Sequence, residues 1–290
     1  MAHAGVLNRT SATIPPQAWF GISAVFHYLG PSFAVLLFPA VGVLGVAWLR
    51  IGSAALVFAP LTRPWRLIAS ATRQDRILLV ALGGCLAAMN CSFYLALARL
   101  PISLVAAIEF VGTIGVALYG MRTRRNLAAL ALAVSGVLLL IELRLSSDAV
   151  GLLWAGLNGS LFVLYVVLGH RIAASGASAG VERLGAAMLI AFVAVFPVGL
   201  IQALAAFRTP WLLLAGCGVG VCSSVIPYIC DQLAMSRLPR SSFALLLTLL
   251  PASATIIGAI VLRQIPSARD LAGIGLVMVG VALHRPANGS

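Results

Sequence analysis

The stretch from Gly84 to Gly120 reads GCLAAMNCSFYLALARLPISLVAAIEFVGTIGVALYG. Two long apolar runs meet in it at Arg99-Leu100-Pro101, and this short polar break indicates a tight turn between two helices. Glu109 stands inside the second run, where a carboxylate costs about 2.5–3.5 kcal/mol to insert into a membrane. A residue that costs so much is by default functional, so we predict a specific role and a partner for Glu109.

The turn has a second copy in the chain. Residues 95–101 read LALARLP and residues 233–239 read LAMSRLP, so five of seven positions are identical at an offset of 138 residues. Internal similarity of this kind indicates a duplication. The predicted organisation is a tail at 1–17, a first repeat at 18–144, a second repeat at 149–284 and a tail at 285–290.

The composition is that of a multi-pass membrane protein. Of the 290 residues, 61% are hydrophobic and 9% are charged, and the mean hydropathy is +1.07, whereas a soluble domain has about 25% charged residues. The net charge of +12 raises the question of nucleic acid binding, but the basic residues lie in short clusters between apolar runs. We therefore exclude nucleic acid as a partner and interpret the arginines as signals for orientation in the lipid bilayer.

The predicted fold is all-α and integral to the membrane. A helix needs about 20 apolar residues to cross a bilayer, and the sequence offers ten such segments. They are 19–38, 41–60, 77–98, 102–121, 125–143, 149–169, 183–204, 210–231, 241–262 and 269–284.

The arginines predict the orientation of these segments, because cytoplasmic loops carry the excess of positive charge. Thirteen arginines lie in the tails and the even-numbered loops, five lie in the odd-numbered loops, and Arg50 lies inside a segment. Both termini are therefore expected in the cytoplasm. With five segments in each half, the halves cross the membrane in opposite senses, and such inverted repeats are typical of secondary transporters with a site near the midplane. Two five-helix halves suit a functional monomer, and a homodimer is the alternative.

Three polar residues fall at one depth in the first half. Arg50 and Glu109 lie nine and seven residues from the outer ends of their segments, roughly 13 Å and 10 Å at 1.5 Å per residue, and Asn90 is at a similar depth. One interpretation is a solute site, in which Arg50 meets a carboxylate and Glu109 meets an ammonium group or carries a coupling proton. The other is a static Arg50–Glu109 ion pair that only holds helices together. The two interpretations are not exclusive.

Three ring side chains extend the list of candidates. Tyr94 lies one turn from Asn90 on the same helix face, either lining a cavity or standing in an aromatic belt at the interface. His27 and Tyr28 precede Pro31, which interrupts the first segment and is expected to kink it. His27 is either a cavity residue or a buried neutral imidazole with a hydrogen-bond partner.

The eighth segment carries a polar group of its own, in which Tyr228 is the site candidate. Asp231 lies near the cytoplasmic end of this segment. We expect it to pair there with Arg237 or Arg240.

No metal or cofactor site is predicted. All five cysteines fall within apolar runs, without a CxxC pair or a histidine at a metal-ligand spacing. The glycines form no P-loop and no GxGxxG motif after a strand, so the chain by itself is not an ATP-driven pump.

The chain resembles the EamA-type transporters of the drug/metabolite transporter superfamily from about Phe38 to Gly280. The stretches that carry the resemblance are Phe38-Pro39-x-Val41-Gly42 leading to Leu49-Arg50, Met89-Asn90 with Phe93-Tyr94-Leu95, Ile108-Glu109-Phe110, and Pro227-Tyr228 followed by Arg237-Leu238-Pro239. The resemblance implies ten helices in two inverted repeats in a bacterial inner membrane. It also implies proton-linked export of small amino acids, such as threonine or homoserine, or of related metabolites.

The same resemblance places Arg50, Asn90 and Glu109 at the polar cavity positions of the family. Similar proteins often carry glutamates at two positions where this chain has Leu250 and Gln264. Two alternatives stay open at this point. One is an exporter of drugs or other metabolites, and the other is an intramembrane lipid-modifying enzyme or protease, although no GxSG-type or HExxH-type motif appears.

Overall fold

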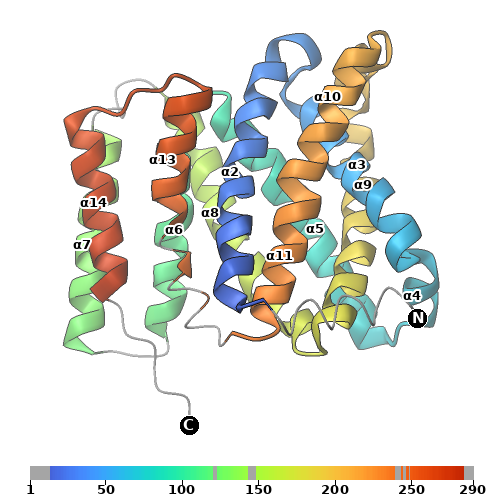
Figure 1. The fold of residues 1–290 in the computed structure, drawn as a ribbon, viewed down its shortest axis with the longest axis horizontal. Coiled ribbons are helices and arrows are strands. Elements are labelled where there is room, and N and C mark those ends of the chain that lie inside the picture. Colours follow the sequence, from blue (N-terminus) through green and yellow to red (C-terminus); the bar gives the residue numbers. More distant parts are fainter. Residues whose placement is uncertain are drawn as a thin grey trace.

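The computed structural model describes residues 14–119, 123–142, 148–238, 243, 246–247 and 249–283. Within these residues the secondary structure is entirely helical, as predicted, and the helices form the upright bundle of Figure 1. The helices are α2 (Pro16–Val41), α3 (Val43–Thr62), α4 (Pro64–Ser70), α5 (Arg73–Leu97), α6 (Ile102–Tyr119), α7 (Arg124–Glu142), α8 (Ala149–Ala173), α9 (Ala177–Phe207), α10 (Pro210–Gly220), the π-helix η1 (Val221–Val225), α11 (Ile226–Met235), α13 (Leu249–Val261) and α14 (Ala268–Leu283).

In the part of the chain that the structure describes, six helical stretches are long and apolar enough to cross a membrane: α2, α3, α5, α8, α9 and the continuous run Pro210–Met235 formed by α10, η1 and α11. Shorter apolar helices cover Ile102–Val111 and Leu250–Val261. The outward surfaces of the helices are apolar as well. On α9, for example, Ile201 is 80% exposed. Apolar side chains spread over so much of the surface suit a lipid environment rather than water. The protein is therefore a multi-pass membrane protein.

The duplicated turn folds in the same way in both copies. After α5, the amides of Arg99 and Leu100 both donate to the carbonyl of Ala96, at 3.0 and 2.8 Å. After α11, the amides of Arg237 and Leu238 both donate to the carbonyl of Ala234, at 3.1 and 2.9 Å. The helices before the turns point in opposite directions, since α5 runs upward in Figure 1 and α11 runs downward. Pro239, the last residue of the second copy, lies outside the described residues.

The packing follows the same correspondence. Helix α5 packs against α8 and α9, and the stretch from α10 to α11 packs against α2 and α3. Helix α6 contacts α8, and α13 contacts α2. Three further contacts join the predicted halves directly: α3 with α9, α6 with α13 and α7 with α14. In the two predicted halves, α2 corresponds to α8, α3 to α9, α5 to the stretch from α10 to α11, α6 to α13 and α7 to α14. When each helix is exchanged for its counterpart, the same set of contacts results.

The first joint of the bundle is a single residue. Gly42 connects α2 to α3 with φ of +82°, a conformation that side chains with a Cβ rarely adopt. The first amides of α3 are satisfied from another helix, because Gln202 Oε1 on α9 accepts from Leu44 N at 2.9 Å and Gly45 N at 3.1 Å. The start of α3 is thereby fixed to α9.

The start of α8 is capped by Asp148. Its carboxylate accepts from Gly151 N at 2.9 Å and pairs with Arg99 Nη1 at 3.0 Å. The Gly151 amide and the Arg99 guanidinium hold the pKa of Asp148 below its usual value. Residues 143–147, at the junction of the two predicted repeats, lie outside the described residues.

Replacement of Gly220 by alanine is predicted to destabilise the protein. A Cβ at Gly220 would lie 1.7 Å from Ser53 Oγ and 2.7 Å from the backbone oxygen of Arg50, so α3 and α10 would have to separate. Overpacking of this kind costs about 1–3 kcal/mol. Gly218, two residues earlier on the same helix, has open space around its Cβ position and provides the matched control. Thermal unfolding in detergent should show a lower midpoint for Gly220→Ala and an unchanged or higher one for Gly218→Ala; equal midpoints would contradict the prediction.

Candidate functional site

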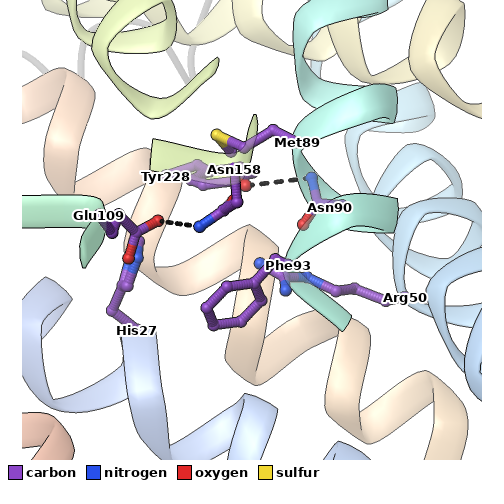
Figure 2. A pocket seen from close by; sticks show the side chains of 8 residues that line it. All are labelled: His27, Arg50, Met89, Asn90, Phe93, Glu109, Asn158 and Tyr228. Atoms are coloured by element: carbon purple, nitrogen blue, oxygen red, sulfur yellow. Dashed lines mark hydrogen bonds between the residues drawn. The ribbon is translucent and has the colours of Figure 1, made fainter. Parts of the chain in front are cut away.

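A small polar cavity lies in the middle of the bundle, between helices from both predicted halves. Figure 2 shows its lining, with Glu109 and Arg50 on opposite sides of the view. The lining residues are His27, Arg50, Met89, Asn90, Phe93, Glu109, Asn158 and Tyr228. They come from α2, α3, α5, α6, α8 and α11, so most of the central helices contribute. The free volume is about 10 Å³, which is room for about one water molecule.

Glu109 is buried, with 3% of its surface exposed, and forms hydrogen bonds to both predicted halves. Its Oε2 accepts from Tyr28 Oη on α2 at 3.1 Å, and its Oε1 accepts from Asn158 Nδ2 on α8 at 3.1 Å. The approach of α8 is close because Gly159 follows Asn158: a Cβ there would lie 3.2 Å from the Cα of Glu109. The partners of this carboxylate are neutral donors.

Arg50 is equally buried, with 3% of its surface exposed. Its Nε donates to Ser224 Oγ at 2.9 Å and its Nη2 donates to the Ser223 carbonyl at 2.8 Å. That carbonyl belongs to η1, where the π-helical turn alters the usual hydrogen-bond pattern. The guanidinium also lies over the ring of Tyr94, 5.2 Å from its centroid. Its Nη1 has no hydrogen-bond partner among the described residues, although it is buried.

The static Arg50–Glu109 ion pair considered from the sequence does not form. In the part of the chain that the structure describes, the ion pairs within 4.0 Å are Arg99–Asp148 and Arg183–Asp75. The buried guanidinium of Arg50 and the buried carboxyl group of Glu109 therefore face the same cavity without forming an ion pair. Burying a charge is costly unless it is paired, so this arrangement suits a ligand that bears both charges.

Asn90 and Tyr228 meet across the cavity. Asn90 Nδ2 donates to the Leu86 carbonyl at 2.7 Å and to Tyr228 Oη at 3.3 Å. These two residues are 138 positions apart, which is the offset of the duplicated turn. Residues at equivalent places in the two predicted halves thus touch at the centre of the bundle.

His27 lines the cavity from α2 and lies against two rings. Its centroid is 5.2 Å from that of Tyr28 and 5.9 Å from that of Phe162. The expectation that Pro31 interrupts the first segment is wrong, since α2 continues through Pro31 from Pro16 to Val41. Proline has no N–H, however, so the His27 carbonyl lacks its helical donor and adds a polar group at this level.

Five of the seven candidates named from the sequence line the cavity, and Tyr28 and Tyr94 contact residues that do. Sequence reasoning missed Asn158, whose only visible signal was an amide side chain in the apolar run AGLNGSLFV. Of the two ion pairs expected for Asp231, the one with Arg237 is not found among the described residues. Arg240 lies outside them.

The two positions where similar proteins often carry glutamates have other uses here. Leu250 is buried in the apolar core. Gln264 Oε1 accepts from Ile102 N at 3.2 Å and so satisfies an amide at the start of α6. Among the described residues, no group of three or more His, Cys, Asp or Glu side chains is placed to hold a metal ion.

Comparisons with known proteins agree with this architecture. Residues 149–284 match the EamA-like transporter family. The threonine/homoserine exporter RhtA of Salmonella typhimurium is 34% identical over 238 residues, which cover 81% of this chain and 79% of that protein. The protein of the same name from Escherichia coli K12 is 31% identical over 252 residues, covering 86% and 84%.

A solved crystal structure of another protein shares the fold, with a TM-score of 0.57 and 18% sequence identity, over 92% of this chain and 96% of its own. At that identity the likeness concerns the fold alone. The relatives share about a third of their residues with this chain over most of its length. On that basis, the chain belongs to the EamA-like transporter family.

Proposed function

We propose that the protein exports small neutral amino acids of the threonine and homoserine kind in exchange for protons. The observation that carries the proposal is the pair of buried, opposite, mutually unpaired groups in one cavity, Arg50 and Glu109. The names of the two relatives, both threonine/homoserine exporters, support the solute class.

An amino acid zwitterion matches the cavity group by group. Arg50 Nη1, which lacks a partner, would donate to the solute carboxylate. Glu109 would accept from the ammonium group in place of Tyr28 or Asn158. Amide and phenol groups of Asn90 and Tyr228 would then be in reach of a hydroxyl on the solute side chain. Each charge of the solute would meet its opposite, which repays the cost of taking both out of water.

Exchange with protons follows if one group serves both ligands. Glu109 can hold a proton or face an ammonium group, but it cannot do both at once. Solute and proton would therefore exclude each other from the cavity, and the export of one would require the import of the other. Such a role would explain why a carboxylate is kept at membrane depth despite the free-energy cost of inserting it.

Alternating access is supported by the duplicated packing. The halves, residues 18–144 and 149–284, correspond in their helix contacts and in the direction reversal of α5 and α11. Inverted repeats of five helices each give two states of similar energy, open to opposite sides. The cavity holds about one water molecule, so an amino acid enters only when helices separate. In this proposal the protein lies in the bacterial inner membrane with both termini in the cytoplasm.

The test is solute-linked proton flux in proteoliposomes that contain the purified protein and a pH-sensitive dye. A panel of small neutral amino acids is added, and threonine or homoserine is expected to drive proton movement that liposomes without protein do not show. If none of the amino acids drives proton movement, the solute class is overturned. Drugs and other metabolites would then be tested in their place. Solute uptake without proton movement would overturn the coupling while keeping the solute.

A further inference from the structure

A second carboxylate is buried in the bundle, outside the lining of the cavity. Asp231 on α11 has 4% of its surface exposed. Its Oδ1 accepts from Ser23 Oγ on α2 at 2.5 Å, and its Oδ2 accepts from Tyr165 Oη on α8 at 3.2 Å. Both donors are neutral hydroxyls, and no cation of the described residues lies within 4.0 Å of it.

Asp231 and Glu109 are held by the same two helices. Each carboxylate accepts one hydrogen bond from α2 and one from α8, which are the first helices of the two predicted halves. On α2 the donors Ser23 and Tyr28 are five residues apart, and on α8 the donors Asn158 and Tyr165 are seven apart. At 1.5 Å per residue these spacings separate the two carboxylates by roughly 7–10 Å along the bundle.

The order of the donors shows which end each carboxylate faces. Ser23 is nearer than Tyr28 to the start of α2, and Tyr165 is nearer than Asn158 to the end of α8. Asp231 itself lies four residues before the end of α11, and Arg237 beyond that end donates to Ile14 O just before α2. Asp231 therefore lies toward the end of the bundle where α2 begins, which is cytoplasmic in the proposed orientation. Glu109 lies toward the opposite end.

A layer of two rings separates Asp231 from the cavity. The ring of Tyr165, whose hydroxyl holds Asp231, lies 5.4 Å from the ring of Tyr228, measured between centroids. Tyr228 lines the cavity and accepts from Asn90. Glu109 thus lines the cavity itself, and Asp231 lies beyond it toward the end of the bundle where α2 begins.

Among the residues that the structure describes, the surroundings of Asp231 offer no counter-charge. The polar groups facing it are Ser23 from α2, Tyr165 from α8, and Tyr228 and Cys230 from its own helix; His27 follows Ser23 one turn later on α2. All of these can remain neutral at physiological pH, as thiols, phenols and an unprotonated imidazole. A negative charge here is costly in every state that keeps water away, and a bound proton removes that cost.

We propose that Asp231 is a second proton carrier, which takes up a proton in the outward-open state and releases it in the inward-open state at the end of the bundle where α2 begins. The proposal rests on the proton exchange proposed above and extends it to two protons for each amino acid exported. In the outward-to-inward step both carboxyls are protonated and the solute is absent. In the inward-open state the Asp231 proton is released to water at the cytoplasmic end, and Glu109 gives up its proton as the solute binds. The return step then carries the solute outward with neither carboxyl protonated.

The experiment measures the solute gradient that a fixed proton gradient sustains in proteoliposomes without membrane potential. For a pH difference of one unit, two protons per neutral zwitterion sustain a solute ratio of about 100, and one proton sustains a ratio of about 10. The wild-type protein is expected to give the higher ratio and Asp231→Asn the lower one. Asparagine keeps the size of the side chain and can still bond to Ser23 and Tyr165. Asp148→Asn, at an exposed helix start, is the control and should leave the ratio at the wild-type value.

The outcomes separate this inference from the proposed function. A wild-type protein that builds no gradient contradicts proton-coupled export as such. A wild-type ratio that Asp231→Asn leaves unchanged overturns the role of Asp231 alone. If the variant does not transport, infrared difference spectra of the detergent-solubilised proteins decide the matter. Over a pH titration, one carboxyl C=O stretching band present in wild type should be missing in Asp231→Asn, and identical titrations would overturn the proposal.

Discussion

Glu109→Gln is expected to reduce proton-driven amino acid export to the level of liposomes without protein. Glutamine has nearly the same shape and can still accept from Tyr28 or Asn158, so the cavity should persist. It cannot bind and release a proton, and its amide offers no charge to an ammonium group. The solute would therefore lose both its ionic partner and its exchange with protons.

The measurement compares net transport down a pH gradient with exchange of labelled for unlabelled solute at equal pH. Wild type should show both, and Glu109→Gln should lack the first. Glu182→Gln provides the matched control, because the same substitution is made on the exposed surface of α9. The role assigned to Glu109 would be refuted by full pH-driven export in the variant, which would leave the residue as a structural link between α2, α6 and α8.

Arg50→Gln is expected to weaken amino acid binding by about 1.5–3 kcal/mol, or roughly 10–150-fold in Kd, which is the range for a hydrogen bond to a charged group. The loss arises because glutamine has no positive charge and does not supply the unpartnered N–H donor that Arg50 has at Nη1. The bonds to Ser224 and Ser223 would also be lost or altered, so part of the loss is structural.

A second ligand separates these contributions. Threoninamide lacks the carboxylate, so wild type should bind it more weakly than threonine by a similar factor. In Arg50→Gln the two ligands should bind about equally, because the group that tells them apart is gone. Binding is measured by calorimetry in detergent, with Arg66→Gln on the exposed surface of α4 as the control. If Arg50→Gln still binds threonine more tightly than threoninamide, a group other than Arg50 binds the solute carboxylate.

The sequence was sufficient for the all-helical fold, because the requirement for about 20 apolar residues per span is a strong one-dimensional signal. The duplicated turn also folds alike in both copies, since the same residues make the same local hydrogen bonds. Features that depend on contacts between segments far apart in the sequence could not be predicted from local sequence patterns. The π-helical turn η1 is an example, because it is stabilised where Arg50 from α3 reaches the Ser223 carbonyl.

The candidate site shows the same division. Counting residues from helix ends brought Arg50, Asn90 and Glu109 to one level, and all three line the cavity. Depth alone does not say which way a side chain faces around its helix, and this is why Asn158 was missed. Asp231 was assigned to arginines close in sequence, whereas its donors come from Ser23 and Tyr165, 208 and 66 positions away.

The π-helical turn also has a consequence for comparing this chain with its relatives. Such a turn is an α-helix that has accommodated one additional residue, and each residue rotates the chain by about 100° around the helix axis. Gly220, before the turn, faces α3, while Tyr228 and Asp231, after it, face the cavity and α8. A relative that lacks the additional residue would turn a different side of α11 inward. Across residues 221–225, an alignment gap of one position therefore changes which side chains are equivalent.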